Sequence, residues 1–360
     1  MLDLRPVGYV IGLLVAILGA TMFLPMVADM VQGQGEWPVF LQSAAVTILV
    51  GVLMALSCSN GVKQGLTIQQ TFLLTTGVWV ALPVFGAIPF MLGETELRFV
   101  DAFFESMSGL TTTGSTVLSG LDTMPHGILL WRALLQWLGG IGIIVVAMVF
   151  LPELRVGGMQ IFRSEGFDTF GKILPRATEI SSRISVIYIG LTGACALAYA
   201  ATGLSPFDAT VHAMTTVATG GFANYDASFG AFDGAAEYVA VLFMMLAALP
   251  FVRFVQMTAG HVQPLFRDSQ IRVFFATAVA LVLALTLWNM TQGQQHGETV
   301  FRKTLFNTVS LLTGTGYAST NYMVWGGFPL TVLFFTGLIG GCPGSTACSI
   351  KFFRYQLLFA

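Results

Sequence analysis

Long uncharged apolar runs alternate along this chain with shorter segments in which apolar and polar residues mix. The uncharged runs cover residues 7–28, 40–60, 71–92, 184–204 and 273–290. Each has about 20 residues, the length that a helix needs to cross a hydrocarbon core of about 30 Å. Two further runs, 126–151 with Arg132 and 238–257 with Arg253, are nearly as apolar. The pattern predicts a chain that crosses a membrane several times as helices.

The first run has a second interpretation, because Arg5 precedes it and a cleaved signal peptide also begins with a basic residue. The apolar core of a signal peptide usually has only about 7–15 residues. The run of residues 7–28 is longer, so we expect a retained membrane span. Proline residues at 83 and 89 predict a kink in the run of residues 71–92.

Shorter amphiphilic segments follow three of the runs, and each leads into a loop rich in glycine and threonine. Residues 101–111 would form a helix of about 17 Å, which is too short to cross a membrane. Ser205, Pro206 and Asp208 form a strong start signal for the second short helix. The third short helix is expected over residues 302–312. The chain therefore repeats one unit: a span, a short helix, a glycine loop and a second span.

The three loops align when Gly114, Gly221 and Gly316 are superposed, as LTTTGST, VATGGFA and LTGTGYA. The alignment extends backwards into the short helices. Nine residues before each glycine stands a polar residue, and six residues before it stands a hydroxyl: Glu105, His212 and Asn307, then Ser108, Thr215 and Ser310. Three matching segments in register indicate an internal repeat.

Composition supports the membrane assignment, since 55% of the residues are hydrophobic and 9% are charged, against about 25% charged in soluble domains. The basic residues form no stripe for nucleic acid. We find no HExxH, GxSxG or phosphate-binding loop, so an enzyme is not expected, and no cofactor is implied. The four cysteines lack CxxC spacing and are expected to be packing residues: Cys58, Cys195, Cys342 and Cys348.

Charge distribution predicts the orientation. Most of the 16 Lys and Arg residues fall at the N-terminus and in segments 60–70, 152–183, 253–272 and 351–360, which would face the cytoplasm. The glycine loops would then face outward. Most of the 18 acidic residues lie on that outer side, where they would concentrate cations.

The glycine loops have the composition that a cation filter requires. Backbone carbonyls can replace the water around a dehydrated monovalent cation without holding it too tightly. Directing successive carbonyls at one axis demands unusual dihedral angles, which glycine adopts readily, and the preceding short helix aims the negative end of its dipole at the cation. The candidate ion-binding residues are Thr111, Thr112, Thr113, Gly114, Ala218, Thr219, Gly220, Gly221, Thr313, Gly314, Thr315 and Gly316.

A glycine- and proline-containing segment interrupts the last apolar run, which begins near Phe328. A continuous helix would not tolerate it, and non-helical backbone at membrane depth persists where it is buried or lines a cavity. The segment comprises Gly340, Gly341, Cys342, Pro343, Gly344, Ser345 and Thr346.

These motifs together carry a family resemblance over essentially the whole chain. The stretches FFESMSGLTTTGST (103–116), WRALLQWLGGIGIIV (131–145) and GGCPGSTACSIKFFR (340–354), with the two additional N-terminal spans, resemble the TrkH/KtrB/HKT superfamily of potassium transporters, and its TrkH branch most. The resemblance implies an all-α polytopic membrane fold of tandem K⁺-channel-like repeats, arranged pseudo-symmetrically around a pore. It also implies K⁺ uptake across the bacterial inner membrane and one filter glycine per repeat.

The same resemblance implies that residues 340–346 form an intramembrane gate below the filter. The family typically reads GSTGGG there, whereas this chain continues with Ala347, Cys348 and Ser349. Fewer glycines predict a stiffer gate. The resemblance further implies a homodimer in the lipid bilayer and a cytoplasmic TrkA-type RCK nucleotide-binding subunit. That ring could dock on the basic run 155–183, although a plain cytoplasmic loop would have the same charge.

We expect residues 1–66 to form a two-helix extension, followed by repeats at 67–155, 156–265 and 266–360. The family has four repeats, and a fourth at this spacing would lie beyond Ala360. A ring of three repeats would leave the pore wall open. The alternative function is therefore a non-transporting regulatory or assembly subunit, or an inactive fragment of such a transporter.

Several polar residues have two interpretations. Glu105 could attract cations or bond the filter backbone, or it could be a buried acid satisfied by nearby hydroxyls. His212 and Asn307 are expected to be structural hydrogen-bonding residues. Arg132 would either extend to the outer surface or tie helices together, and Arg253 is expected to anchor its helix at the inner interface.

Overall fold

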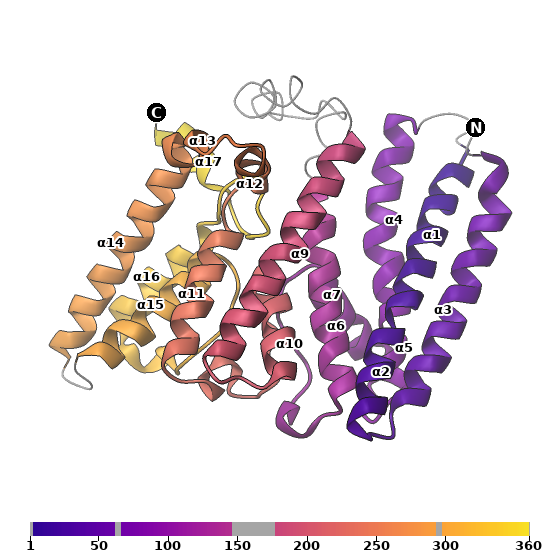
Figure 1. Ribbon diagram of the computed structural model, residues 1–360, viewed down its shortest axis with the longest axis horizontal. Helices are drawn as coiled ribbons and strands as arrows, with labels where there is room; N and C mark the ends of the chain where they lie inside the picture. Colours follow the sequence, from indigo (N-terminus) through magenta and orange to yellow (C-terminus); the bar gives the residue numbers. More distant parts are fainter. Residues whose placement is uncertain (1–2, 62–65, 146–176, 293–296, 360) are drawn as a thin grey trace. The chain divides into compact units, whose positions relative to one another are not determined.

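The computed structural model describes residues 3–61, 66–145, 177–292 and 297–359 (Figure 1). The chain divides into two compact units, Met1–Leu138 and Gly139–Ala360. Regular structure in the described residues is helical, apart from an isolated parallel bridge between Ile339 and Ile350. The expected repeat boundaries at 67, 156 and 266 do not coincide with the division between the units, and they stay predictions.

The first unit packs its helices through small residues. It contains α1 (Arg5–Thr21), α2 (Phe23–Gln32), α3 (Trp37–Cys58), α4 (Ile68–Gly86), α5 (Ile88–Leu92), α6 (Phe99–Leu110) and the first part of α7 (His126–Val145). Helices α1, α3 and α4 run side by side (Figure 1). A Cβ added to Gly12 would lie 2.6 Å from the backbone nitrogen of Ala55. Close approach through such residues is how helices associate in membranes.

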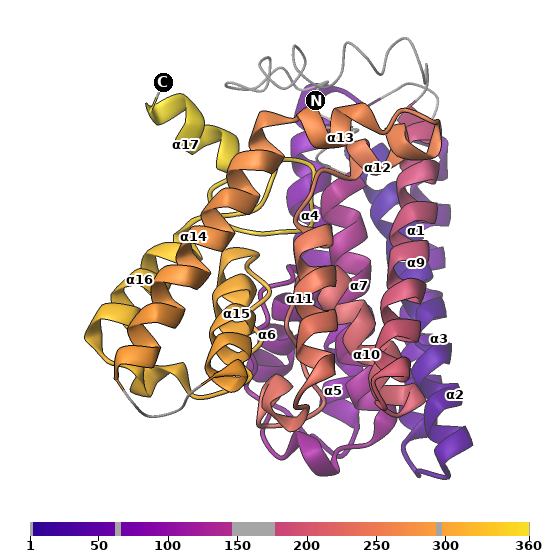
Figure 2. The same cartoon turned by 60° about the vertical axis from the view of Figure 1, so that its left-hand side comes forward.

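The second unit contains the second and third of the short helices that precede glycine loops, α10 and α15, together with seven other α-helices in the described residues. These are α9 (Ala177–Ala201), α10 (Pro206–Val217), α11 (Ala235–Ala247), α12 (Phe251–Thr258), α13 (Gln263–Arg267), α14 (Ser269–Thr291), α15 (Glu298–Leu312), α16 (Gly327–Leu338) and α17 (Phe352–Phe359). Helix α15 packs on α11, α14 and α16 (Figure 2), and α10 packs on α9. Single 3₁₀ turns lie at Ser59–Gly61, Leu121–Thr123, Ser228–Ala231 and Tyr322–Trp325.

Five segments have the length and apolarity needed to cross a membrane: Arg5–Gln32, Trp37–Cys58, Ile68–Leu92, Ser181–Ala201 and Ser269–Thr291. The five uncharged runs are therefore confirmed as helices, and the chain is a multi-pass membrane protein. In the third, Pro83 lies within α4 and Pro89 lies in the first turn of α5, with one residue, Ala87, between the two helices. Ser205 caps α10 as expected, because its hydroxyl accepts from the N–H of Asp208 at 3.0 Å.

The apolar run expected over residues 238–257 is not one straight helix. Helix α11 ends at Ala247, α12 begins at Phe251, and the two axes are bent by 88°. Pro250 lies at the break and has no N–H to continue a helix. The break expected after α16 is present, because α16 ends at Leu338 and the next helix begins at Phe352. Helix α15 begins at Glu298, four residues earlier than predicted.

Candidate ion-conducting site

Each glycine loop continues its short helix through the same backbone turn. The residue three before the glycine donates its N–H to the carbonyl four residues earlier: Thr111 to Met107 at 2.8 Å, Ala218 to Met214 at 3.0 Å and Thr313 to Val309 at 2.9 Å. The residue directly before the glycine donates to the carbonyl five residues earlier, at 2.9 Å in all three loops: Thr113 to Ser108, Gly220 to Thr215 and Thr315 to Ser310. The aligned sequences therefore fold alike.

Two positions in each loop have left-handed backbone dihedrals. The three aligned glycines have φ values of 80° at Gly114, 75° at Gly221 and 85° at Gly316. The residues two before them have φ values of 54° at Thr112, 50° at Thr219 and 71° at Gly314. Left-handed φ costs a non-glycine residue about 1–2 kcal/mol. The sequence alone did not predict this second position, although Gly314 in the third loop is a signal for it.

A side chain nine residues before each glycine holds the chain after the loop. In every repeat, it accepts a hydrogen bond from the N–H three residues after the glycine. The pairs are Glu105 Oε2 with Val117 at 3.0 Å, His212 Nε2 with Asn224 at 3.4 Å and Asn307 Oδ1 with Ser319 at 3.2 Å. All three side chains are fully buried. His212 and Asn307 are thus the structural hydrogen-bonding residues that we expected.

Glu105 fits the interpretation of a buried acid that nearby hydroxyls satisfy, and attraction of cations stays a prediction. Its carboxylate is buried and accepts from the hydroxyl of Thr116 at 2.9 Å, and it also bonds the backbone of Val117. The guanidinium of Arg132 on α7 pairs with it at 2.8 Å, and the Arg132 side chain is 2% exposed. Arg132 therefore ties α6 to α7, and the interpretation that it extends to the outer surface is wrong.

The second and third loops contact each other within the second unit. A Cβ added to Gly221 would overlap the carbonyl oxygen of Thr315. Tyr317 strengthens the contact, because its buried hydroxyl bonds the hydroxyl of Thr215 and lies 3.3 Å from the carbonyl oxygen of His212. Loop 111–114 belongs to the other unit and has the same local geometry.

The segment expected to form a gate is buried over most of its length and bonds to the break between α11 and α12. Cys342 donates its N–H to Ala248 O at 3.0 Å, and Thr346 donates to Ala247 O at 3.3 Å. In return, Phe251 donates its N–H to Gly344 O at 2.9 Å. Backbone N–H and C=O groups that have no helical partner at the break after α11 are thus hydrogen-bonded to those of the segment after α16. Pro250 was the sequence signal for the break after α11, because a proline disfavours helical backbone at the residue before it.

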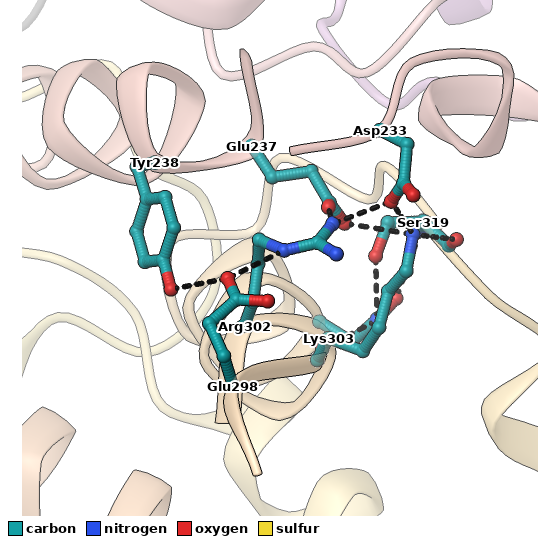
Figure 3. Close-up of polar contacts among 8 residues, drawn as sticks. Asp233, Glu237, Tyr238, Glu298, Arg302, Lys303 and Ser319 are labelled. Carbon is teal, nitrogen blue, oxygen red and sulfur yellow. Dashed lines mark hydrogen bonds and ion pairs between the residues drawn. The ribbon is translucent and has the colours of Figure 1, made fainter. Parts of the chain in front are cut away.

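A charged cluster lies at the start of α15 (Figure 3). The Arg302 side chain is 6% exposed and pairs with the fully buried carboxylate of Glu237 at the start of α11. It also bonds Asp233 at 2.5 Å and Glu298 at 2.8 Å. Hydrogen bonds from Arg302 and then Lys303 lower the pKa of Asp233 to about 2. The sequence carried no signal for this cluster, because Asp233 and Glu237 are 69 and 65 residues away from Arg302 along the chain.

Lys303 connects this cluster to the chain after the third loop. Its ammonium lies 3.0 Å from Asp233 and 3.2 Å from Glu237, and it donates to the carbonyl of Ser319 at 3.2 Å. Ser319 also receives a hydrogen bond from Asn307 Nδ2 on its hydroxyl, at 3.1 Å. The cluster therefore holds the chain that follows the third loop.

Other predicted residues lie away from the loops. Arg253 pairs with Asp268 at 2.7 Å, which joins α12 to the start of α14. In the basic run expected to dock a partner, Arg183 is exposed, and residues 155–176 lie outside the described residues. None of the four cysteines, all of which lie in the described residues, is in a disulfide. Within the described residues, no group of His, Cys, Asp and Glu could hold a metal ion.

Comparison with known proteins agrees with this geometry. The sequence profile of the TrkH family, described as a cation transport protein, matches residues 36–360. The chain is 39% identical to the "Trk system potassium uptake protein TrkI" of Halomonas elongata, over 98% of this chain and 72% of that protein. It is 36% identical to the "Trk system potassium uptake protein TrkH" of Escherichia coli K12, over 99% and 74% respectively.

The fold agrees as well. The crystal structure of the potassium transporter TrkH from Vibrio parahaemolyticus superposes with a TM-score of 0.90, at 35% identity, over 99% of this chain and 75% of that one. The profile match, the identities and the superposition cover nearly all of the three loops and the interrupted helices described above. This chain belongs to the TrkH family of cation transport proteins.

Proposed function

We propose that this protein takes up K⁺ through a filter of backbone carbonyls formed by its glycine loops. One observation carries the proposal. Three loops that follow three short helices share the same hydrogen bonds and the same pair of left-handed residues. The family relatives support K⁺ as the ion, since they are named as potassium uptake proteins.

The filter residues are the twelve that the sequence alignment identifies, four from each loop. A K⁺ ion that enters loses water, and carbonyl oxygens replace the lost ligands. The short helices α6, α10 and α15 all end at a loop, so the negative ends of their dipoles favour a cation there. Because carbonyls have no full charge, the ion is held weakly enough to move on.

Residues 340–346 are the gate in this proposal. The segment lacks helical hydrogen bonds of its own and depends on those with the break after α11. Exchanging a few such bonds costs far less than unwinding a helix, so the segment is suited to move. Ala347, Cys348 and Ser349 replace the glycines that are usual in the family, which gives a stiffer gate.

The location, orientation and partners of the protein are also proposed. Lys and Arg distribution supports an inner-membrane location with the filter loops outward. Family membership supports a homodimer and a cytoplasmic TrkA-type RCK subunit. The alternative of a non-transporting assembly subunit has no observation in its favour among the described residues.

Growth at limiting K⁺ tests the function. A host that lacks its own K⁺ uptake systems should grow when it carries the complete gene that encodes this chain. Gly114→Ser should reduce K⁺ uptake and its preference over Na⁺, because it places a side chain at a left-handed residue of the filter. Gly193→Ser in α9 is the matched control, since a Cβ there meets nothing within 4 Å. Failure of the wild-type gene to restore growth, with the protein present in the membrane, would rule out the function.

A further inference from the structure

The gate segment contacts the filter directly, at the inner end of the second loop. The hydroxyl oxygen of Thr346 lies 3.1 Å from the carbonyl oxygen of Val217 and 3.1 Å from that of Ala247. Val217 is the last residue of α10, and Ala218, the first residue of the second filter loop, follows it. Thr346 is 1% exposed. One side chain of the gate thus lies between the filter and the break after α11.

This contact satisfies a carbonyl that the helix leaves open. The last four carbonyls of a helix have no donor within it. A hydroxyl has one proton, so Thr346 can donate to Val217 or to Ala247 at any moment but not fully to both. Its backbone N–H bonds Ala247 independently. The hydroxyl is therefore free to hold the end of α10 while the backbone holds the gate.

A second contact joins the chain just after the gate segment to the third loop. Gly314, which like Gly316 has a left-handed φ in that loop, has φ 71°, and a Cβ added to it would lie 3.1 Å from the Cβ of Cys348. Cys348 follows Thr346 by two residues. The chain from Thr346 to Cys348 therefore lies against two filter loops, at Val217 before the second loop and at Gly314 within the third.

We propose that Thr346 is a positioning residue for the filter, so that displacement of the gate changes ion selectivity as well as flux. The inference rests on the proposed K⁺ uptake. While the gate is seated, Thr346 fixes the carbonyl of Val217 and thereby the start of the second loop. When the gate moves, the hydroxyl leaves, and the inner end of the filter loses a buried hydrogen bond.

The neighbouring hydroxyl provides a contrast within the gate. Ser345 is also buried, but its hydroxyl donates to Cys342 O at 2.6 Å, within the gate itself. Ser345→Ala should change the rate at which the gate moves and leave the selectivity of the seated filter as it was. Thr346→Val should change both.

Initial rates of K⁺ and Na⁺ uptake into membrane vesicles measure the effect, using the complete gene that encodes this chain. Thr346→Val keeps the side-chain volume and removes the donor. We expect its K⁺/Na⁺ rate ratio to fall about fivefold, which corresponds to one buried hydrogen bond. Thr346→Ser keeps the donor and should retain the wild-type ratio. Thr346→Cys, with a weaker donor, should fall between them.

The matched control is Thr331→Val, the same substitution in α16, where the hydroxyl is exposed and bonds only Gly327 O of its own helix. Thr331→Val should leave the K⁺ uptake rate and the K⁺/Na⁺ rate ratio unchanged. If Thr346→Val, or Thr346→Cys where the valine variant does not insert, alters the rate but keeps the wild-type ratio, the proposal is overturned while K⁺ uptake stands. If wild-type vesicles take up no K⁺, the proposed function itself fails, which is a separate result.

Discussion

Arg302 on α15 forms a buried ion pair with Glu237 on α11, and so binds the third short helix to the helix that closes the second repeat. The side chains are 6% and 0% exposed. The pair lies near the N-terminal ends of both helices, while Gly221 and Thr315 make contact between the loops. The orientation of α15, and with it the third loop, therefore depends on a residue of the second repeat.

Breaking this pair should destabilise the protein strongly. Arg302→Met leaves Glu237 as a buried charge without its main partner, which costs about 3–5 kcal/mol. We expect a lower midpoint of thermal unfolding in detergent and reduced K⁺ uptake. Arg98→Met is the control, because Arg98 is exposed and its pair with Asp101 contributes about 0–1 kcal/mol. Equal stability of the two variants would contradict the importance of the buried pair.

The filter glycines should differ in their tolerance of alanine. Gly316→Ala introduces backbone strain of about 1–2 kcal/mol, but its Cβ would meet nothing within 4 Å. Gly221→Ala has similar strain and also overlaps the carbonyl oxygen of Thr315, a candidate ion ligand. Gly221→Ala should therefore lower K⁺ uptake more than Gly316→Ala, as measured by initial rates at equal protein levels. The reverse order would show that the two loops are not in contact.

Glu105 and Arg132 should behave as a unit. Glu105→Gln retains an acceptor for the N–H of Val117 but leaves Arg132 buried without its negative partner, at a cost of about 3–5 kcal/mol. Adding Arg132→Met should recover part of the lost stability. The double-mutant cycle, measured by thermal unfolding, should give a coupling energy of about 1–3 kcal/mol. Additive effects of the two substitutions would contradict a direct pair.

Acid should weaken the charged cluster at the start of α15 by protonating Asp233. Its pKa is about 2 in the folded protein, against an ordinary value of 3.8, because Arg302 and Lys303 bond its charged form. A lowered pKa means that this stabilisation is complete above the ordinary value and is lost as the pH falls through the folded value. The midpoint of thermal unfolding should therefore drop between about pH 4 and pH 2. Asp233→Asn should show a smaller drop over that range.

Local signals predicted much of the fold correctly. Ser205, Pro206 and Asp208 predicted the start of α10, because capping depends on residues adjacent in sequence. Glycine and proline at 340–344 predicted an interrupted helix for the same reason. The alignment on Gly114, Gly221 and Gly316 predicted loops of like conformation. Their shared φ values agree with that, although Thr112 and Thr219 adopt left-handed angles that their residue type disfavours.

Contacts between distant residues could not be predicted from the sequence. Arg302 finds Glu237 across 65 residues of chain, and Thr346 finds Val217 across 129. The break after α11 was missed because its free carbonyls bond to Cys342 and Thr346, which lie in the non-helical segment between α16 and α17.

The sequence by itself determined the membrane spans, the short helices and the three loops, since apolar length, caps and glycine act over a few residues. Only the tertiary structure decided that the second and third loops contact each other and that residues 340–346 bond to the break after α11. These contacts form because buried charges and carbonyls without a helical partner need hydrogen-bond or ion-pair partners once water is excluded.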